Sequence, residues 1–258
     1  MPANYAFHRF GADALRLLPG QMQGNIQRFR RLYNGGLRGQ DLFFYYKPMS
    51  DNPISGLRST YDAMTGREFF EKAAAHLKQN PSEGGTACIY GLLAHYCLKS
   101  QLAPLFAAEV NSSKVNRTEL EVEFDRYLLG LDGKTPAHTQ DISASFKMTR
   151  GECLTLTGFF PPATPANVTS ALKQMTGWTR RLAAPKRTFA RVLLTFTKGE
   201  FADQMMPDHA NHKCLHLDSA MLECYHAALD KFPDMAKRLA LHCKNGAPLG
   251  EEFELPFV

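Results

Sequence analysis

The segment YGLLAHYCLKS, residues 90–100, has a largely apolar helical pattern that carries two polar side chains, His95 and Lys99. These two residues are four apart, so they project from the same face of a helix. A lone histidine on such a helix is more often a hydrogen-bonded core residue than a metal ligand. Whether His95 is a core residue or a metal ligand therefore depends on which side chains a second helix places next to it.

A second segment, RTELEVEFDR at residues 117–126, offers an acidic side chain. Arg117 and Glu121 are also four apart, and Leu120 and Phe124 indicate that this helix face is partly buried. Two helices that each present a His/acid pair would form a metal-binding cleft. In this chain each pair combines one ligand-type residue with one cation, as in a metal site with parts replaced.

Helical periodicity extends over most of the chain and predicts an all-α fold, a multi-helix bundle in a single domain over residues 1–258. Candidate helices cover Arg9–Leu18, Met22–Tyr33, Ser59–Gln79, Thr86–Ser100, Thr118–Leu129, Ala163–Ala184, Leu217–Lys231 and Pro233–Lys244. Alternating period-2 patterns are scarce, apart from the short and ambiguous Val192–Phe196. No internal repeat and no linker long enough to divide two domains is present.

The composition is that of an ordinary globular protein. The 258 residues are 44% hydrophobic and 21% charged, and the formal net charge is +5. This charge is spread along the chain, and its short basic clusters lack the aromatic-and-basic repeat of a nucleic-acid surface. We therefore expect no nucleic-acid partner, whereas a phosphate-bearing ligand remains compatible with the charge.

Targeting signals and disulfide patterns are also lacking. No stretch approaches the roughly 20 apolar residues that span a bilayer, so we expect no transmembrane segment. Arg9 and Asp13 interrupt any apolar run of a secretory signal. The six cysteines contain no CxxC pair and fall mostly within helical patterns. These features predict reduced core cysteines and a cytoplasmic protein.

The densest group of borderline metal ligands is the segment HANHKCLHLD, which contains His209, His212 and His216 and ends at Asp218. Tetrahedral zinc sites usually combine two structural elements with a recognisable short spacing. We interpret the segment first as a loop that enters a helix capped by Asp218, and second as a zinc or nickel site. The aromatic run that follows Asp41 is similarly more typical of the buried side of a short helix than of a membrane-docking surface.

Several segments together resemble a bacterial family of zinc-dependent phospholipase C-like proteins. The resemblance extends from Met1 to Glu251 and rests on MPANYAFHRFGA, GLRGQDLFFYYKP, AMTGREFF, YGLLAHYCLKS, RTELEVEFDRYLLGLDGKTPAHTQD, PPATP, CLHLD and NGAPLGE. It implies an all-α bundle of the phospholipase C/P1 nuclease type with a multi-zinc cleft. The activity that it implies is hydrolysis of a phospholipid phosphodiester, in which a zinc-activated water oriented by Asp41 attacks phosphorus.

The resemblance carries the family's metal ligands over only in part. His95, Glu121 and Asp41 stand at ligand positions and are retained. The remaining positions depart from the family pattern and contain Phe7, Asp62, Lys99, Ala103 and Arg117. His8 could compensate for Phe7 by a shift of one residue.

Two of the departing residues, Lys99 and Arg117, add positive charge to the expected site. Arginine never deprotonates and cannot be a zinc ligand, and a lysine could be one only after losing its proton. Lys99 and Arg117 would therefore supply two fixed positive charges where the family holds dications, and Asp41, Asp62 and Glu121 would pair with them. This predicts a degenerate zinc site with weakened or lost catalysis.

Two alternatives remain open. In one, Lys99 and Arg117 reach solvent while a single zinc stays on His95, Asp41 and Asp62 and supports phospholipid hydrolysis. In the other, the protein binds no metal and acts as a module for a partner or an anion. Lys99 and Arg117 would then bind a phospholipid head group or another phosphate-bearing ligand, with Arg117 in a bidentate manner. Nothing in the sequence identifies a protein partner.

Overall fold

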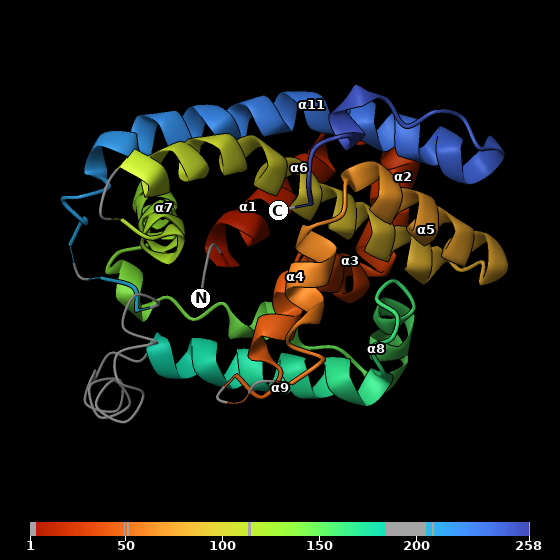
Figure 1. Cartoon of the computed structure of the whole chain (residues 1–258), viewed down its shortest axis with the longest axis horizontal. Coiled ribbons are helices and arrows are strands. Elements are labelled where there is room, and N and C mark those ends of the chain that lie inside the picture. Colours follow the sequence, from red (N-terminus) through yellow and green to blue (C-terminus); the bar gives the residue numbers. More distant parts are fainter. Residues whose placement is uncertain are drawn as a thin grey trace.

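The computed structural model describes residues 4–48, 50, 52–112, 115–183, 205–207 and 209–257. Within these ranges the regular structure is helical and no β-strand occurs, so the prediction of an all-α fold is confirmed for them (Figure 1). An isolated antiparallel bridge joins Thr65 to Pro256. The ambiguous segment Val192–Phe196 lies outside the described residues.

The described helices are the following. The α-helices are α1 (Asn4–Arg16), α2 (Gly20–Arg28), α3 (Arg30–Gly36), α4 (Leu57–Asp62), α5 (Gly66–Gln79), α6 (Glu83–Ser112), α7 (Arg117–Leu131), α8 (Arg150–Thr157), α9 (Pro165–Leu182) and α11 (Asp218–Asn245). Short 3₁₀ helices are η1 (Gly39–Tyr45), η2 (Ala137–Thr139), η3 (Ser143–Phe146), η5 (Leu215–Leu217) and η6 (Glu251–Phe253). The short helix expected after Asp41 is therefore present as η1.

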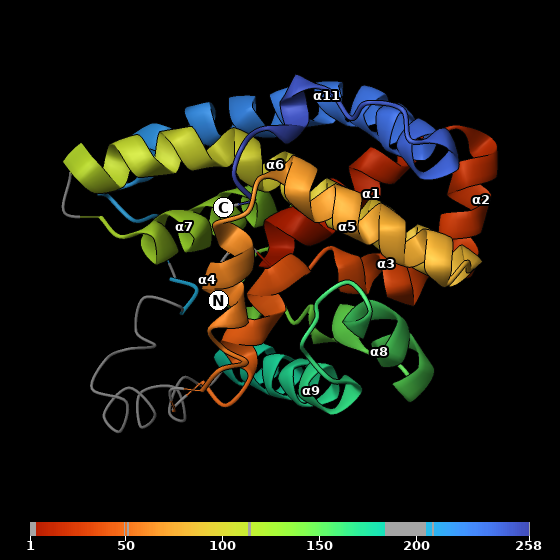
Figure 2. The same ribbon diagram turned by 45° about the vertical axis from the view of Figure 1, so that its right-hand side comes forward.

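Helix α6 forms the centre of the hydrophobic core. Its residues from Ala87 to Ser100 are all buried, and most of them are apolar, so this part of the helix is enclosed on every face. It packs against α3 on one side and α11 on another. In Figure 1 and Figure 2, α11 runs along α6 while α9 lies at the opposite edge of the molecule.

Glycines allow α3 and α6 to approach very closely. A Cβ added to Gly91 would lie 2.1 Å from the Tyr33 carbonyl oxygen, and one added to Gly36 would lie 2.3 Å from the Cys88 carbonyl oxygen. Neither backbone could accommodate a side chain there. This contact brings the start of η1, which follows α3, next to the middle of α6.

A capping box divides the predicted helix Ser59–Gln79. The Thr65 hydroxyl accepts a hydrogen bond from Glu68 N at 3.1 Å, and the Glu68 carboxylate accepts one from Thr65 N at 2.8 Å. Thr65 is extended, so α4 ends at Asp62 and α5 begins at Gly66. The prediction of one helix is wrong, and the break leaves Asp62 at the end of α4.

Other boundaries also differ from the prediction. The segment predicted as Met22–Tyr33 divides at Phe29 into α2 and α3. Pro233 lies inside one continuous α11, and α6 continues past Pro104 to Ser112. A proline within a helix costs about 3 kcal/mol, and burial of Phe232 and Phe106 offsets this cost in the two helices. Helix α8 was not predicted.

The structure also bears on the membrane and cysteine predictions. None of the helices described here has both the length and the apolar character needed to cross a bilayer. All six cysteines are free thiols, and Cys88, Cys97, Cys153 and Cys214 are buried. Cys243 is exposed, so it is not a core residue as predicted.

Candidate functional site

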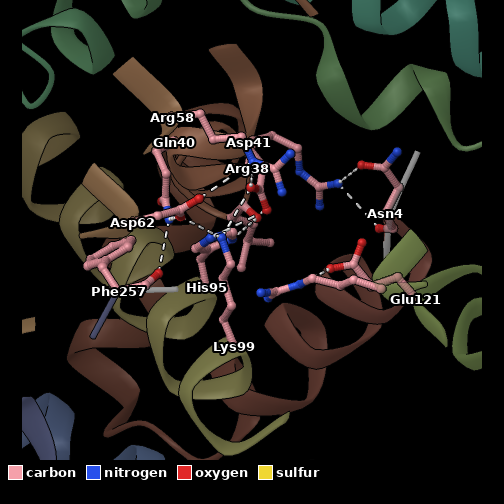
Figure 3. A network of polar contacts seen from close by, with 12 residues as sticks. Asn4, Arg38, Gln40, Asp41, Arg58, Asp62, His95, Lys99, Glu121 and Phe257 are labelled. Carbon is pink, nitrogen blue, oxygen red and sulfur yellow. Dashed lines mark hydrogen bonds and ion pairs between the residues drawn. The ribbon is translucent and has the colours of Figure 1, made fainter. Parts of the chain in front are cut away.

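Three separate helices bring Asp41, Asp62 and Lys99 together. Asp41 lies on η1, Asp62 ends α4, and Lys99 lies on α6. Lys99 Nζ is 3.1 Å from Asp41 Oδ1 and 3.0 Å from Asp62 Oδ1, so it donates to both carboxylates (Figure 3). Only 4% of the Lys99 side-chain surface is exposed, whereas 21% and 26% of the two aspartate side chains are exposed.

Arg58 completes this group. Its Nε lies 2.9 Å from Asp41 Oδ1 and 3.7 Å from Asp62 Oδ2. Arg58 and Asp62 are four residues apart on α4, a spacing that brings opposite charges together on one helix face. We call Asp41, Arg58, Asp62 and Lys99 the ion-pair cluster; it contains two cations and two anions. Sequence reasoning missed Arg58, although its spacing from Asp62 was a signal.

The cations decide the protonation state of Asp41. Burial alone would raise the pKa of this carboxyl, but the charges of Lys99 and Arg58 outweigh burial and hold the pKa well below its ordinary value. Asp41 is therefore ionised throughout the neutral range. The ionised Asp41 carboxylate accepts hydrogen bonds from Lys99 and Arg58, and its negative charge compensates that of the largely buried Lys99 ammonium.

His95 lies beside the ion-pair cluster and is fully buried. Its Nδ1 is 3.2 Å from the Leu37 carbonyl oxygen, which can only accept, so Nδ1 carries the proton. Its Nε2 is then an acceptor; it faces Asp41 Oδ2 at 3.8 Å and has no hydrogen-bond partner. Burial lowers the pKa of the imidazole to about 3, so the ring is neutral at physiological pH.

Aromatic rings enclose the imidazole. Phe7 lies 4.4 Å from it and Phe257 lies 6.0 Å from it, measured between ring centres, and both rings are nearly parallel to the imidazole. Phe7 stands where the resemblance implies a histidine, and it contacts His95 as an apolar ring. Its neighbour His8 has a pKa lowered by burial to about 4, with Arg38, Arg30 and Lys134 adding to the effect.

The C-terminal residues close over the cluster. Gln40 Nε2 donates to Asp62 Oδ1 at 2.6 Å and to the Phe257 carbonyl oxygen at 3.0 Å (Figure 3). Phe257 N donates to the Met64 carbonyl oxygen at 2.7 Å, and Gly66 N donates to the Leu255 carbonyl oxygen at 2.9 Å. Residues 255–257 are therefore hydrogen-bonded to the connection between α4 and α5 and, through Gln40, are linked to Asp62 of the ion-pair cluster.

The second predicted pair lies on α7. Arg117 Nε is 3.0 Å from Glu121 Oε1, with 32% of the Arg117 side chain and 7% of the Glu121 side chain exposed. Burial raises the pKa of Glu121, and the nearby Arg117 charge opposes this rise. Arg117 and Ala103 both line a mainly apolar surface groove of about 470 Å³ between α6 and the Leu255–Pro256 segment.

The histidine-rich segment has the predicted loop character. His209, His212 and His216 are exposed, and His216 Nε2 lies 3.7 Å from Glu109 Oε2. The expected cap is wrong, because Asp218 forms no capping hydrogen bond and is the first residue of α11. Its Oδ2 instead lies 3.5 Å from Arg126 Nη2.

The donor groups can be compared with the needs of a metal ion. Within the described ranges, no three His, Cys, Asp or Glu side chains converge in an arrangement that could hold one. The ligand-type oxygens of Asp41 and Asp62 are turned to the Lys99 ammonium instead. A dication that used both carboxylates would have to displace this ammonium, so the residues as arranged do not fit a multi-zinc centre.

Comparisons of the chain with protein-family models, with curated proteins and with solved structures found no match.

Proposed function

We propose that this protein is a catalytically silent relative of the zinc-dependent phospholipase C-like proteins, with a fold of the phospholipase C/P1 nuclease type. The proposal rests on the sequence resemblance and on one observation in particular. The Lys99 ammonium lies 3.1 Å and 3.0 Å from the two carboxylates that the resemblance would assign to metal binding, Asp41 and Asp62. A protonated amine there supplies the positive charge that a dication would supply.

The same observation explains why hydrolysis would be lost. Metal-dependent phosphodiester hydrolysis uses a dication to lower the pKa of a bound water and to stabilise charge on the attacked phosphorus centre. An ammonium that donates its protons to two carboxylates has no lone pair and no open coordination position for a water. Arg58 cannot supply one either, because a guanidinium does not deprotonate in proteins.

One observation favours a second candidate, a phospholipid phosphodiesterase with a single zinc. His95 Nε2 has no partner, and the Leu37 carbonyl fixes the ring through Nδ1, which is how metal-binding histidines are commonly oriented. Zinc would bind there with Asp41 and Asp62 only if Lys99 left its present position. We rank this candidate second for that reason.

A hydrolysis assay distinguishes the two candidates. Purified protein is incubated with a short-chain phosphatidylcholine, with and without added zinc, beside the His95→Ala variant. The silent protein should release no more phosphorylated head group than the variant under either condition. Zinc-dependent release by the wild-type protein that His95→Ala abolishes would establish the single-zinc enzyme and overturn the proposal.

A further inference from the structure

Residues 209–217, which precede α11, are attached to α7 through acidic side chains. The Asn211 amide nitrogen donates to Glu123 Oε2 at 3.0 Å, and Lys213 Nζ lies 3.3 Å from Glu119 Oε1. The Glu123 side chain is fully buried, whereas 58% of the Lys213 side chain is exposed. Exposed ion pairs contribute little to stability, so the hydrogen bond from Asn211 to Glu123 is the main polar attachment.

Two buried carboxylates share one cation at this attachment. Arg126 Nη2 lies 2.6 Å from Glu123 Oε1 and 3.5 Å from Asp218 Oδ2. Asp218 is 8% exposed, and its Oδ1 is buried without a hydrogen-bond partner. When both carboxyls are ionised, one guanidinium cannot compensate both charges, which is unfavourable away from water.

The titratable side chains of the preceding segment do not supply the missing positive charge at neutral pH. Cys214 is buried, and burial raises the pKa of its thiol to about 11, so the thiol is neutral. His216 faces Glu109 Oε2 at 3.7 Å and is charged only when protonated. His209 and His212 are exposed to solvent.

A proton on Asp218 removes the uncompensated charge. It ends the repulsion between the two carboxylates and leaves the Arg126 guanidinium to Glu123 alone. Burial, together with the Glu123 charge, raises the pKa of Asp218 to about 6 against the opposing effect of Arg126. Because this pKa is higher than in the unfolded chain, protonation stabilises the fold. The stabilisation is complete below the unfolded value of about 4 and is lost as the pH rises through 6.

We propose that Asp218 is the proton acceptor of a pH-sensitive switch, in which its protonation strengthens the attachment of residues 209–217 to α7 and its ionisation weakens it. The switch operates between about pH 7 and pH 5, where carboxyls with ordinary pKa values stay ionised. It is independent of the proposed function, because it involves neither zinc nor the ion-pair cluster.

Hydrogen exchange of the Asn211 amide tests the proposal, because this amide is bonded to Glu123. Exchange rates, corrected for the intrinsic effect of pH, are compared at pH 7.5 and pH 5. Protection of Asn211 should be about tenfold greater at pH 5, since the Asp218 pKa lies about one unit above that pH and one unit corresponds to a tenfold change.

Three variants make the test specific. Asp218→Asn keeps the shape of the side chain without its charge, so Asn211 should already have at pH 7.5 the protection that the wild type reaches at pH 5. Glu109→Gln removes the carboxylate that faces His216 and should retain the change with pH. Asp234→Asn removes a carboxylate of α11 that is 64% exposed and should also retain it.

Protection of Asn211 that is equal at the two pH values in the wild type would overturn the proposal whatever the variants do. A change with pH that persists in Asp218→Asn would also overturn it. So would a change that disappears in Glu109→Gln, because this result would assign the switch to His216.

Discussion

Lys99 and Asp62 are joined by an ion pair of 3.0 Å between Nζ and Oδ1, although they lie on different helices. The resemblance implies an aspartate where Lys99 stands and a histidine where Asp62 stands. Under the proposed relationship, an ammonium and a carboxylate would replace an anionic ligand and a neutral one, and these two residues bind each other. Each replacement alone would leave a largely buried charge without a partner, so we expect the two to depend on one another.

Replacing Lys99 by methionine should destabilise the protein by about 3–5 kcal/mol, because Asp41 and Asp62 would then share a partly buried space with less positive charge. Urea denaturation at pH 7 measures the free energy of unfolding. Lys231→Met is the matched control, since Lys231 lies on the surface and bonds Gln101 at 2.8 Å. It should change stability by no more than about 0.5 kcal/mol. Equal effects of the two variants would contradict a structural role for the Lys99 ammonium.

Acid should remove the stability that Asp41 provides. The folded-state pKa of Asp41 lies below its unfolded value of about 4, so its contribution is complete above that value and is lost as the pH falls below it. The stability difference between wild type and Asp41→Asn should therefore be large at pH 7 and shrink toward pH 2.

Unfolding measured across that pH range checks the prediction. Asp234→Asn serves as control, because Asp234 is 64% exposed in its pair with Arg238. Its difference from wild type should be small at every pH. A difference for Asp41→Asn that stays constant from pH 7 to pH 2 would mean that the Asp41 pKa is not depressed.

Gly39→Ala should destabilise the protein. Gly39 has φ +53°, and an added Cβ would lie 2.5 Å from His95 Cδ2, so the variant combines backbone strain with a clash against the fixed imidazole. We expect a loss of at least about 1–2 kcal/mol. Gly24→Ala in α2, where an added Cβ meets nothing within 4 Å, should be neutral or stabilising by about 0.5–1 kcal/mol in the same denaturation experiment. Similar losses in both would refute the close approach of Gly39 to His95.

Gln40→Met should loosen the C-terminal closure of the site. The variant loses the hydrogen bonds from Gln40 to Asp62 and to the Phe257 carbonyl. Amide hydrogen exchange at Phe257 and Gly66 should accelerate, because both amides bond across this closure. Gln23→Met, which removes a bond to the Leu18 carbonyl, should leave both rates unchanged. Unaltered exchange in Gln40→Met would show that Gln40 does not hold the segment.

The sequence predicted most helices because their periodicity is long and regular. It failed at the division of Ser59–Gln79, where the Thr65 and Glu68 side chains override a continuous apolar pattern. It also missed α8, although Thr149 and Glu152 form the same capping signature. At Pro233 the sequence predicted a break between two helices, but α11 is continuous there. Packing of α11 keeps the helix intact at a residue type that normally ends one.

For the site, spacing and resemblance together predicted that Asp41, Asp62 and Lys99 would pair. Neither predicted that Arg38 would be buried, with Asn4 as its hydrogen-bond acceptor and the Phe146 ring beneath its guanidinium. These contacts join residues far apart in the chain, so local sequence patterns could not predict them. The enclosure of His95 by Phe257 was also unpredictable, since the two residues are far apart in the chain.

Zinc bound per chain tests the central claim most directly. Protein purified without an affinity tag is equilibrated with zinc, dialysed and analysed by mass spectrometry, beside the double variant Lys99→Asp with Arg117→His. If the Lys99 ammonium fills the place of a dication, the wild-type protein should hold well below one zinc per chain and the double variant should hold more. One or more zinc ions in the wild type, lost in His95→Ala, or no gain in the double variant, would contradict the account.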